Sequence, residues 1–215
     1  MKKLIPLFLV LALLLSACGS KVPETSEYPV TAPLATDGLS LAEASVDDLT
    51  FSYPDEIWLM DEASTPLTFY YAESLDAETG FANINVQVSV PCSSALTEKD
   101  LADICDDLRT QGLTLSTSEL RTLNGTVFIY TESVLQFTDD LIDTMLDTGI
   151  LTEESLNALG GREVLLSIPS SPQVAFYIPI DGNLIIFTGT YFNAEEKQAV
   201  CDAITIMAQT GKVPS

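Results

Sequence analysis

Few side chains in this 215-residue chain could carry out catalysis. The chain contains no His, so a His general base and His-based metal binding are both excluded. Lys99 and Lys197 are predicted to be exposed in the first turns of helices, and neither a Gly-rich phosphate loop nor a G-x-S-x-G motif occurs. A catalytic carboxylate pair stays open, because 31 acidic residues offer too many combinations to select one. We therefore predict a protein that is not an enzyme and needs no cofactor.

Three aspartates are the candidate metal ligands. Asp139, Asp143 and Asp147 stand four residues apart and so share one side of a predicted helix, where like charges repel each other. No Lys or Arg within this helix compensates them. The stripe could bind a divalent cation or a basic partner, or it could be a solvated acidic face, which is the preferred interpretation. Its spacing does not fit a calcium loop with ligands at alternate positions.

The N-terminus has the three zones of an export signal. Lys2 and Lys3 precede an apolar run from Leu4 to Leu15, and small residues follow it. The run is shorter than the roughly 20 apolar residues that a membrane-spanning helix needs. We therefore predict a signal peptide that is removed.

The end of this run, Leu15-Ser16-Ala17-Cys18 followed by Gly19, resembles a bacterial lipobox. The alternative is an ordinary secretory signal with an accidental cysteine. The resemblance implies cleavage after residue 17, lipid attachment to the Cys18 thiol as in palmitate-bearing lipoproteins, and a location at the extracytoplasmic face of the cell membrane. Two or more acyl chains hold a protein stably at a membrane.

Cys92, Cys105 and Cys201 remain, an odd number that permits at most one intramolecular disulfide. Their connectivity stays open. Cys105 and Cys201 lie near the apolar faces of predicted helices, which favours small buried side chains for both. Redox chemistry is not predicted, because no Cys-x-x-Cys pair occurs.

The charge balance excludes some partners. The chain has 9 Lys and Arg against 31 Asp and Glu, and loss of Lys2 and Lys3 takes its formal net charge from −22 to −24. Such a surface repels nucleic acid and anionic lipid headgroups. With 47% hydrophobic residues the chain nevertheless has the composition of a folded protein.

Residues 18–45 contain three prolines among polar residues and predict a flexible tether, with a short helical turn at 41–44. Residues 46–215 predict one domain. Its strands are predicted from alternating or β-rich segments and from turns at Asn124-Gly125 and Asp181-Gly182. They are expected at 49–53, from Trp58 onward, and at 67–73, 82–90, 114–122, 126–134, 164–168, 173–180 and 183–192.

Helices are predicted between the strands. One is capped by Thr97 and ends at Gly112, and the last is capped by Asn193 and ends at Gly211. A helical hairpin is predicted as an insertion at 137–161, with helices at 139–147 and after Thr152. The order of elements predicts an α+β fold with a largely antiparallel sheet and flanking helices.

The start Phe51-Ser52-Tyr53-Pro54, then Trp58, and the strand pair that runs into the last helix resemble the PsbP/Mog1-like α/β/α sandwich. This fold occurs in small bacterial lipoproteins and in an extrinsic subunit of photosystem II. The resemblance spans roughly 46–210 and implies a fold, whereas the photosystem role is not carried over. The aromatic residues of the motif are predicted to pack in the core.

The sequence thus predicts a lipid-anchored extracytoplasmic module that binds another envelope protein. The alternative is a divalent-cation-binding or sensing module that uses the acidic helical hairpin. A binding module is expected to expose a contiguous apolar patch, for which 141–159 is the candidate segment.

Overall fold

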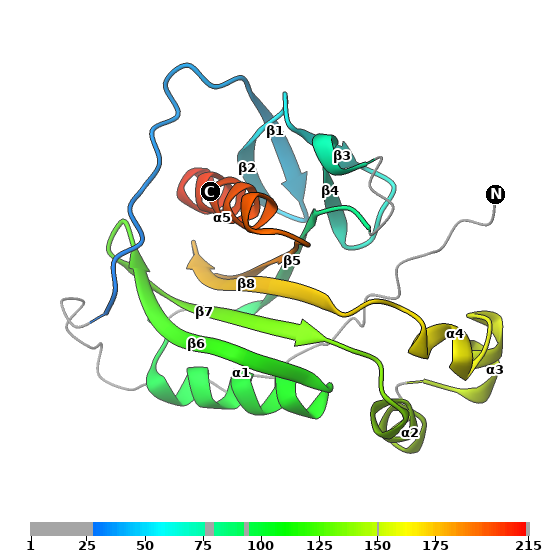
Figure 1. Cartoon of the computed structure of the whole chain (residues 1–215). Coiled ribbons are helices and arrows are strands. Elements are labelled where there is room, and N and C mark those ends of the chain that lie inside the picture. Colours follow the sequence, from blue (N-terminus) through cyan, green and yellow to red (C-terminus); the bar gives the residue numbers. More distant parts are fainter. Residues whose placement is uncertain (1–27, 76–79, 93–94, 150, 214–215) are drawn as a thin grey trace.

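A computed structural model describes residues 28–75, 80–92, 95–149 and 151–213 (Figure 1). Its central element is a seven-stranded sheet in the order β3-β4-β5-β9-β8-β7-β6, in which every neighbouring pair is antiparallel. The strands are β3 (Trp58–Asp61), β4 (Leu67–Tyr71), β5 (Asn83–Pro91), β6 (Leu113–Leu123), β7 (Thr126–Leu135), β8 (Ser171–Ile180) and β9 (Asn183–Thr190). A 3-10 turn, η2 (Ala72–Ser74), follows β4 where the sequence predicts two more strand residues.

The two long helices begin where their capping residues predict. In α1 (Glu98–Thr110), the Thr97 side chain accepts a hydrogen bond from the Asp100 N–H, and the Asp100 carboxylate accepts one from the Thr97 N–H. In α5 (Ala194–Thr210), Asn193 Oδ1 accepts from the Glu196 N–H. The Glu196 carboxylate accepts from the N–H of Phe192, one residue before the cap, at 2.7 Å.

Helices cover both faces of the sheet. α1 lies on one face, and α5 lies on the other together with the hairpin of β1 (Leu41–Val46) and β2 (Leu49–Pro54) (Figure 1). The main core lies between α5, this hairpin and the sheet, and the predicted core residues Phe51, Tyr53 and Trp58 are buried in it. The predicted α+β class is thereby confirmed.

The segment predicted as a tether differs from the structure over its described part. Residues 41–46 form strand β1, paired with β2 throughout its length, so the helical turn predicted at 41–44 is wrong. The Pro29 carbonyl accepts from the Thr122 N–H at 2.9 Å, and the Thr31 N–H donates to the Thr122 carbonyl at 2.8 Å. Tertiary pairing overrides the helix propensity of the sequence Leu-Ala-Glu-Ala. Residues 28–45 are therefore held against the domain, and 18–27 lie outside the described residues.

A third helix follows the predicted helical hairpin. α2 (Asp139–Asp147), α3 (Glu153–Ala158) and α4 (Arg162–Leu166) pack around a small core of their own. The strand predicted at 164–168 is wrong, because a short apolar run does not distinguish a strand from a helix and Leu165 is buried against the other two helices. The apolar patch expected at 141–159 is also wrong, since Leu141, Ile142, Met145, Leu151 and Leu156 are buried.

Gln209 on α5 fastens the N-terminal segment 28–40 to the domain. Its side-chain carbonyl accepts from the Leu34 N–H at 3.0 Å, and its amide donates to the Leu34 carbonyl at 2.8 Å. We predict that Gln209→Ala lowers the free energy of unfolding by about 1–2 kcal/mol, since each hydrogen bond contributes about 1 kcal/mol. Hydrogen exchange at the Leu34 amide should be faster. Gln198→Ala, on the same helix but exposed, is the control, and unchanged exchange at Leu34 in the first variant would contradict the prediction.

Candidate functional site

A pocket of about 460 Å³ lies between the N-terminal segment 28–40, helix α5 and the sheet. Because α5 packs over β8 and β9, the neighbouring strands β6 and β7 extend beyond it on the same face of the sheet. Lys197, Cys201 and Thr205 line the α5 wall. The floor consists of Arg121, Tyr130 and Phe176, and the N-terminal wall of Thr31, Ala32 and Leu34.

Side-chain alternation brings a cation and an aromatic ring together on the floor. Glu119 pairs with Tyr130 across strands β6 and β7, and Arg121 lies two residues further along β6 on the same face. The Arg121 guanidinium lies over the Tyr130 ring, 3.6 Å from its centroid, and forms an ion pair with Glu119 at 2.6 Å. This contact with the ring face is a cation–π interaction.

Glu132 connects the floor to α5. It accepts a hydrogen bond of 2.6 Å from the Tyr130 hydroxyl and forms an ion pair of 2.8 Å with Lys197. Burial acts to raise the pKa of Glu132, but the hydrogen bonds from Lys197 and Tyr130 and the charges of Lys197 and Arg121 outweigh it, so the pKa is lowered. The pKa of Lys197 is raised, because its bond to Glu132 and nearby charges outweigh the effect of burial. Burial and the bond to Glu132 raise the pKa of Tyr130.

Cys201 is the thiol in the pocket wall. Burial raises its pKa to about 11, although the Lys197 charge acts to lower it. Since the thiolate is the nucleophilic form, this shift favours the protonated, less nucleophilic form of Cys201 at neutral pH. Cys105 and Cys201 are free thiols, with Cys105 buried as predicted and Cys201 partly exposed.

The sequence predictions did not include this pocket. Lys197 was expected to be exposed, yet its side chain is only 33% exposed and is paired with Glu132. Arg121 and Tyr130 were not singled out. One signal could have found them: Glu119 with Arg121 and Tyr130 with Glu132 are each two residues apart on predicted strands, so each pair shares a face of the sheet.

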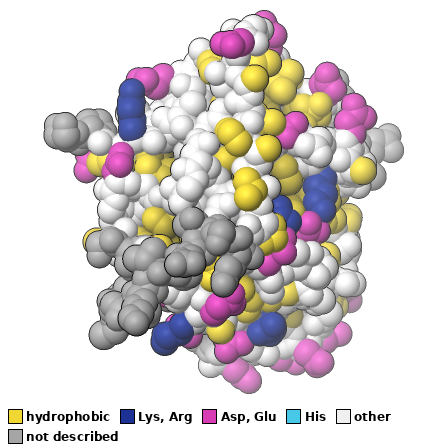
Figure 2. Space-filling view, turned by 90° about the vertical axis from the view of Figure 1, so that its left-hand side faces the viewer, with side chains coloured by type: hydrophobic (Ala, Val, Ile, Leu, Met, Phe, Trp, Pro, Cys, Tyr) yellow, Lys and Arg dark blue, Asp and Glu magenta, His cyan; other side chains and the backbone are white. Residues whose placement is uncertain are grey.

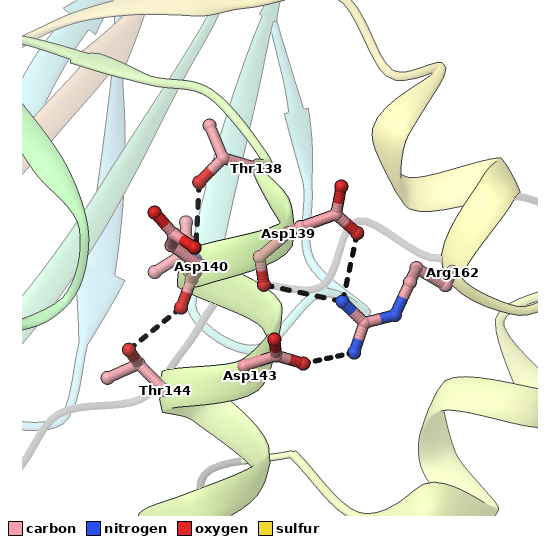
Figure 3. A network of polar contacts seen from close by, with 7 residues as sticks. Thr138, Asp139, Asp140, Asp143, Thr144 and Arg162 are labelled. Atoms are coloured by element: carbon pink, nitrogen blue, oxygen red, sulfur yellow. Dashed lines mark hydrogen bonds and ion pairs between the residues drawn. The ribbon is translucent and has the colours of Figure 1, made fainter.

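The acidic stripe is compensated from another helix. Arg162 at the start of α4 points between two carboxylates of α2 (Figure 3). It donates to Asp139 Oδ1 at 3.0 Å and also to Asp143 Oδ1. Asp147, at the far end of α2, takes no part in these two bonds. Within the described residues, no group of three Cys, Asp or Glu side chains is arranged to hold a metal ion. The guanidinium therefore places one positive charge at two of the three carboxylates of the stripe.

Acidic side chains are spread over the face in Figure 2, and the basic side chains visible there lie close to acidic ones. Hydrophobic side chains on this face occur in small groups. Among the described residues, none of the helices has the length and apolar character of a membrane-crossing segment. Cys18, the predicted lipid-attachment residue, lies outside the described residues.

These features define an α+β protein with a large antiparallel sheet, flanking helices and a polar pocket beside α5. No protein-family model matches the chain, and no curated protein sequence matches it.

Solved structures similar to the chain include the following three. One is the cyanobacterial PsbP (CyanoP) of Synechocystis sp. PCC 6803, with 18% identity, a TM-score of 0.45, and coverage of 84% of this chain and 97% of that one. The Ran-binding protein Mog1p of Saccharomyces cerevisiae has 9% identity, a TM-score of 0.45 and coverage of 82% and 96%. LpqN of Mycobacterium tuberculosis, described as involved in cell envelope biogenesis, has 12% identity, a TM-score of 0.46 and coverage of 83% and 93%. With TM-scores below 0.5, these likenesses carry no conclusion about function.

The contacts of Glu132 predict a pH-dependent stability. Because its folded-state pKa is lowered, its contribution is fully present above the ordinary value of 4.5 and is lost as the pH falls through the lowered value. At neutral pH we predict that Glu132→Gln lowers the free energy of unfolding by about 1–2 kcal/mol, through loss of charge-assisted hydrogen bonds.

Denaturant titrations between pH 3 and 7 measure this difference. Glu154→Gln, on an exposed part of α3, should differ little from the wild type at every pH. A difference for Glu132→Gln that is the same at pH 3 and pH 7 would contradict the role assigned to the carboxylate.

Proposed function

We propose that this chain is a lipid-anchored extracytoplasmic binding module without catalytic activity, attached through Cys18. The observation that supports the non-catalytic part is that the ionisable groups of the pocket already bind one another, since Glu132 accepts a hydrogen bond from Tyr130 and pairs with Lys197. The pKa shifts of Glu132, Lys197, Tyr130 and Cys201 all favour the form that each group already has at pH 7. A general acid or base instead needs a pKa near the working pH, and a thiol nucleophile needs a lowered one.

A protein of the cell envelope is the proposed partner. Large apolar side chains are exposed at the β3 end of the sheet: Leu59 is 46% and Phe81 is 41% exposed. Leu59 pairs with Tyr70 across strands β3 and β4, and the Tyr70 ring contacts Phe81 with centroids 5.2 Å apart. Leu59, Tyr70 and Phe81, here called the edge patch, therefore form one continuous surface. Exposed apolar groups of this kind are typical of protein contact sites.

The cation-binding alternative is not favoured by the position of Arg162. Its guanidinium already forms ion pairs with both Asp139 and Asp143. A metal ion at these carboxylates would have to displace it.

The anchor can be tested by metabolic labelling with a fatty acid. Cys18→Ala should remain as an unprocessed precursor and incorporate no acyl chain, because the thiol is the group that is alkylated. Cys92→Ala should be labelled like the wild type. Labelling of the Cys18→Ala variant at the wild-type level would refute the lipid anchor.

The partner surface can be tested by cross-linking in intact cells. We expect a discrete cross-linked product with the wild type, reduced at least about tenfold in Leu59→Ser, since loss of about 1.4 kcal/mol of binding energy has this effect. Val30→Ser changes another exposed apolar residue away from the edge patch and is the control. Equal yields from both variants would exclude the edge patch as the contact.

A further inference from the structure

We propose that the edge patch binds a cationic amphipathic segment of the envelope partner, one in which Lys or Arg side chains stand beside apolar ones. The apolar side chains of this segment contact Leu59 and Phe81, and its cations contact the carboxylates at the two ends of β3. The inference rests on the proposed function, because it names the chemistry of the partner at the same surface.

The edge patch is accessible to such a partner. Trp58 and Met60 pack into the main core beneath α5, so the alternation of side chains places Leu59, between them, on the opposite face of the sheet. In the described part of the chain, α1 covers that face over β6 to β9, at the other end of the sheet, and leaves Leu59 and Phe81 exposed. Ile57, two residues before Leu59, is also exposed.

Carboxylates surround this apolar surface. Asp61 lies two residues after Leu59 on the same face of β3, and its charge acts together with burial, the larger cause, to raise the pKa of Tyr70 in the edge patch. The Ala72 N–H donates to the carbonyl of Ile57 at 3.0 Å, which brings the next residue, Glu73, beside the start of β3. We call the carboxylates before, after and beside β3 the acidic rim: Asp55, Glu56, Asp61, Glu62 and Glu73.

The chain supplies no cation to the acidic rim. The sequence has no Lys or Arg between Lys21 and Lys99. Among the described residues, every ion pair lies elsewhere, on α1, at the pocket beside α5, or between α2 and α4. The stripe on α2 has Arg162, and Glu132 has Lys197, whereas the rim carboxylates form no ion pair. Uncompensated charge beside an apolar surface complements a partner that is both cationic and apolar.

The same charges disfavour the other occupants of the edge patch. In a two-fold dimer the same surface of each copy meets at the axis, so a second copy would bring two acidic rims together. Anionic lipid headgroups and nucleic acid are repelled in the same way. A neutral apolar partner would take the carboxylates out of water without supplying a counter-charge, which is costly.

The probe is an acetylated and amidated peptide with two copies of the repeat Lys-Leu-Ala-Lys-Leu-Ala-Lys, whose Leu residues share one side of a helix. The full chain is reconstituted in phosphatidylcholine nanodiscs, and binding is measured by calorimetry against empty nanodiscs. We expect saturable binding, at least tenfold tighter than that of the peptides with Gln in place of Lys or with Ser in place of Leu.

Three results would overturn the proposal. Equal affinity for the Gln peptide would show that the surface binds apolar groups without regard to charge. Equal affinity for the Ser peptide would show attraction between charges alone. The third is the absence of saturable binding of the Lys peptide at about 1 mM, the weak end of specific affinities.

Matched variants locate the site. The double substitution Asp61→Asn with Glu62→Gln removes two rim charges, and its amide at position 61 keeps an oxygen that can accept the hydrogen bond from the Ala63 N–H. It should weaken binding of the Lys peptide at least fivefold. Glu153→Gln with Glu154→Gln removes an equal charge from the exposed surface of α3 and should leave the affinity unchanged. Equal weakening by both pairs would show a general effect of net charge and would refute the site.

Comparison with the cross-linking in intact cells separates this inference from the proposed function. If Leu59→Ser reduces the cross-linked product while the Lys and Gln peptides bind equally, the edge patch remains the contact and the cationic partner is refuted. If the Lys peptide binds with the expected preference while Leu59→Ser is cross-linked like the wild type, the envelope contact is refuted and the cation-binding surface remains.

Discussion

Helix α5 lies so close to β9 that residue 189 has to be a glycine. A Cβ atom at Gly189 would lie 2.1 Å from Val200 Cγ1, well inside van der Waals contact. This close approach buries Val200, Ile204 and Met207 completely against the sheet. The position of α5 in turn determines the positions of strand β2 and of the N-terminal segment, which are hydrogen-bonded to its C-terminal end. Thr210 accepts a hydrogen bond from the Ser52 N–H of β2, and residues on either side hold the N-terminal segment and the strand β2.

The scarcity of basic residues shapes the polar structure. With 9 Lys and Arg against 31 Asp and Glu, each cation has many possible partners. Arg162 and Lys197 use this in different ways. Arg162 joins α4 to α2 on an exposed surface, where ion pairs add little stability. Lys197 joins α5 to β7 at a partly buried position beside the pocket, where a charge pair has larger consequences for ionisation.

Local signals predicted most of the fold. Asn124 and Asp181, each followed by Gly, adopt the positive φ that two-residue hairpin turns require, and both hairpins form as predicted. The caps at Thr97 and Asn193 also act locally, and both helices begin there. The secondary structure of residues 41–46 and 162–166, by contrast, depends on long-range contacts. The first segment becomes a strand by pairing with β2, and the second becomes a helix by burying Leu165.

The pocket was beyond the reach of local signals for the same reason. Arg121, Tyr130 and Lys197 come from three separate elements. Only the register of the sheet and the position of α5 on it bring them together. Thr31 was assigned to a flexible tether, so nothing in the sequence pattern placed its hydroxyl beside them. The alternation of side chains shows that the two members of each pair share a face of their strand. It does not show that both pairs lie beside the same pocket.

The fastening of residues 29–34 has a mechanical consequence. If Cys18 carries the lipid, the chain between the membrane and the first fastened residue, Pro29, is 11 residues long and can reach at most about 40 Å. A pull on the anchor is borne first by the two backbone bonds at Thr122 and then by the Gln209 amide, before any load reaches the strands of the sheet. The pocket wall lies between these two points of attachment. Tension along the anchor would therefore open the pocket before it unfolded the domain.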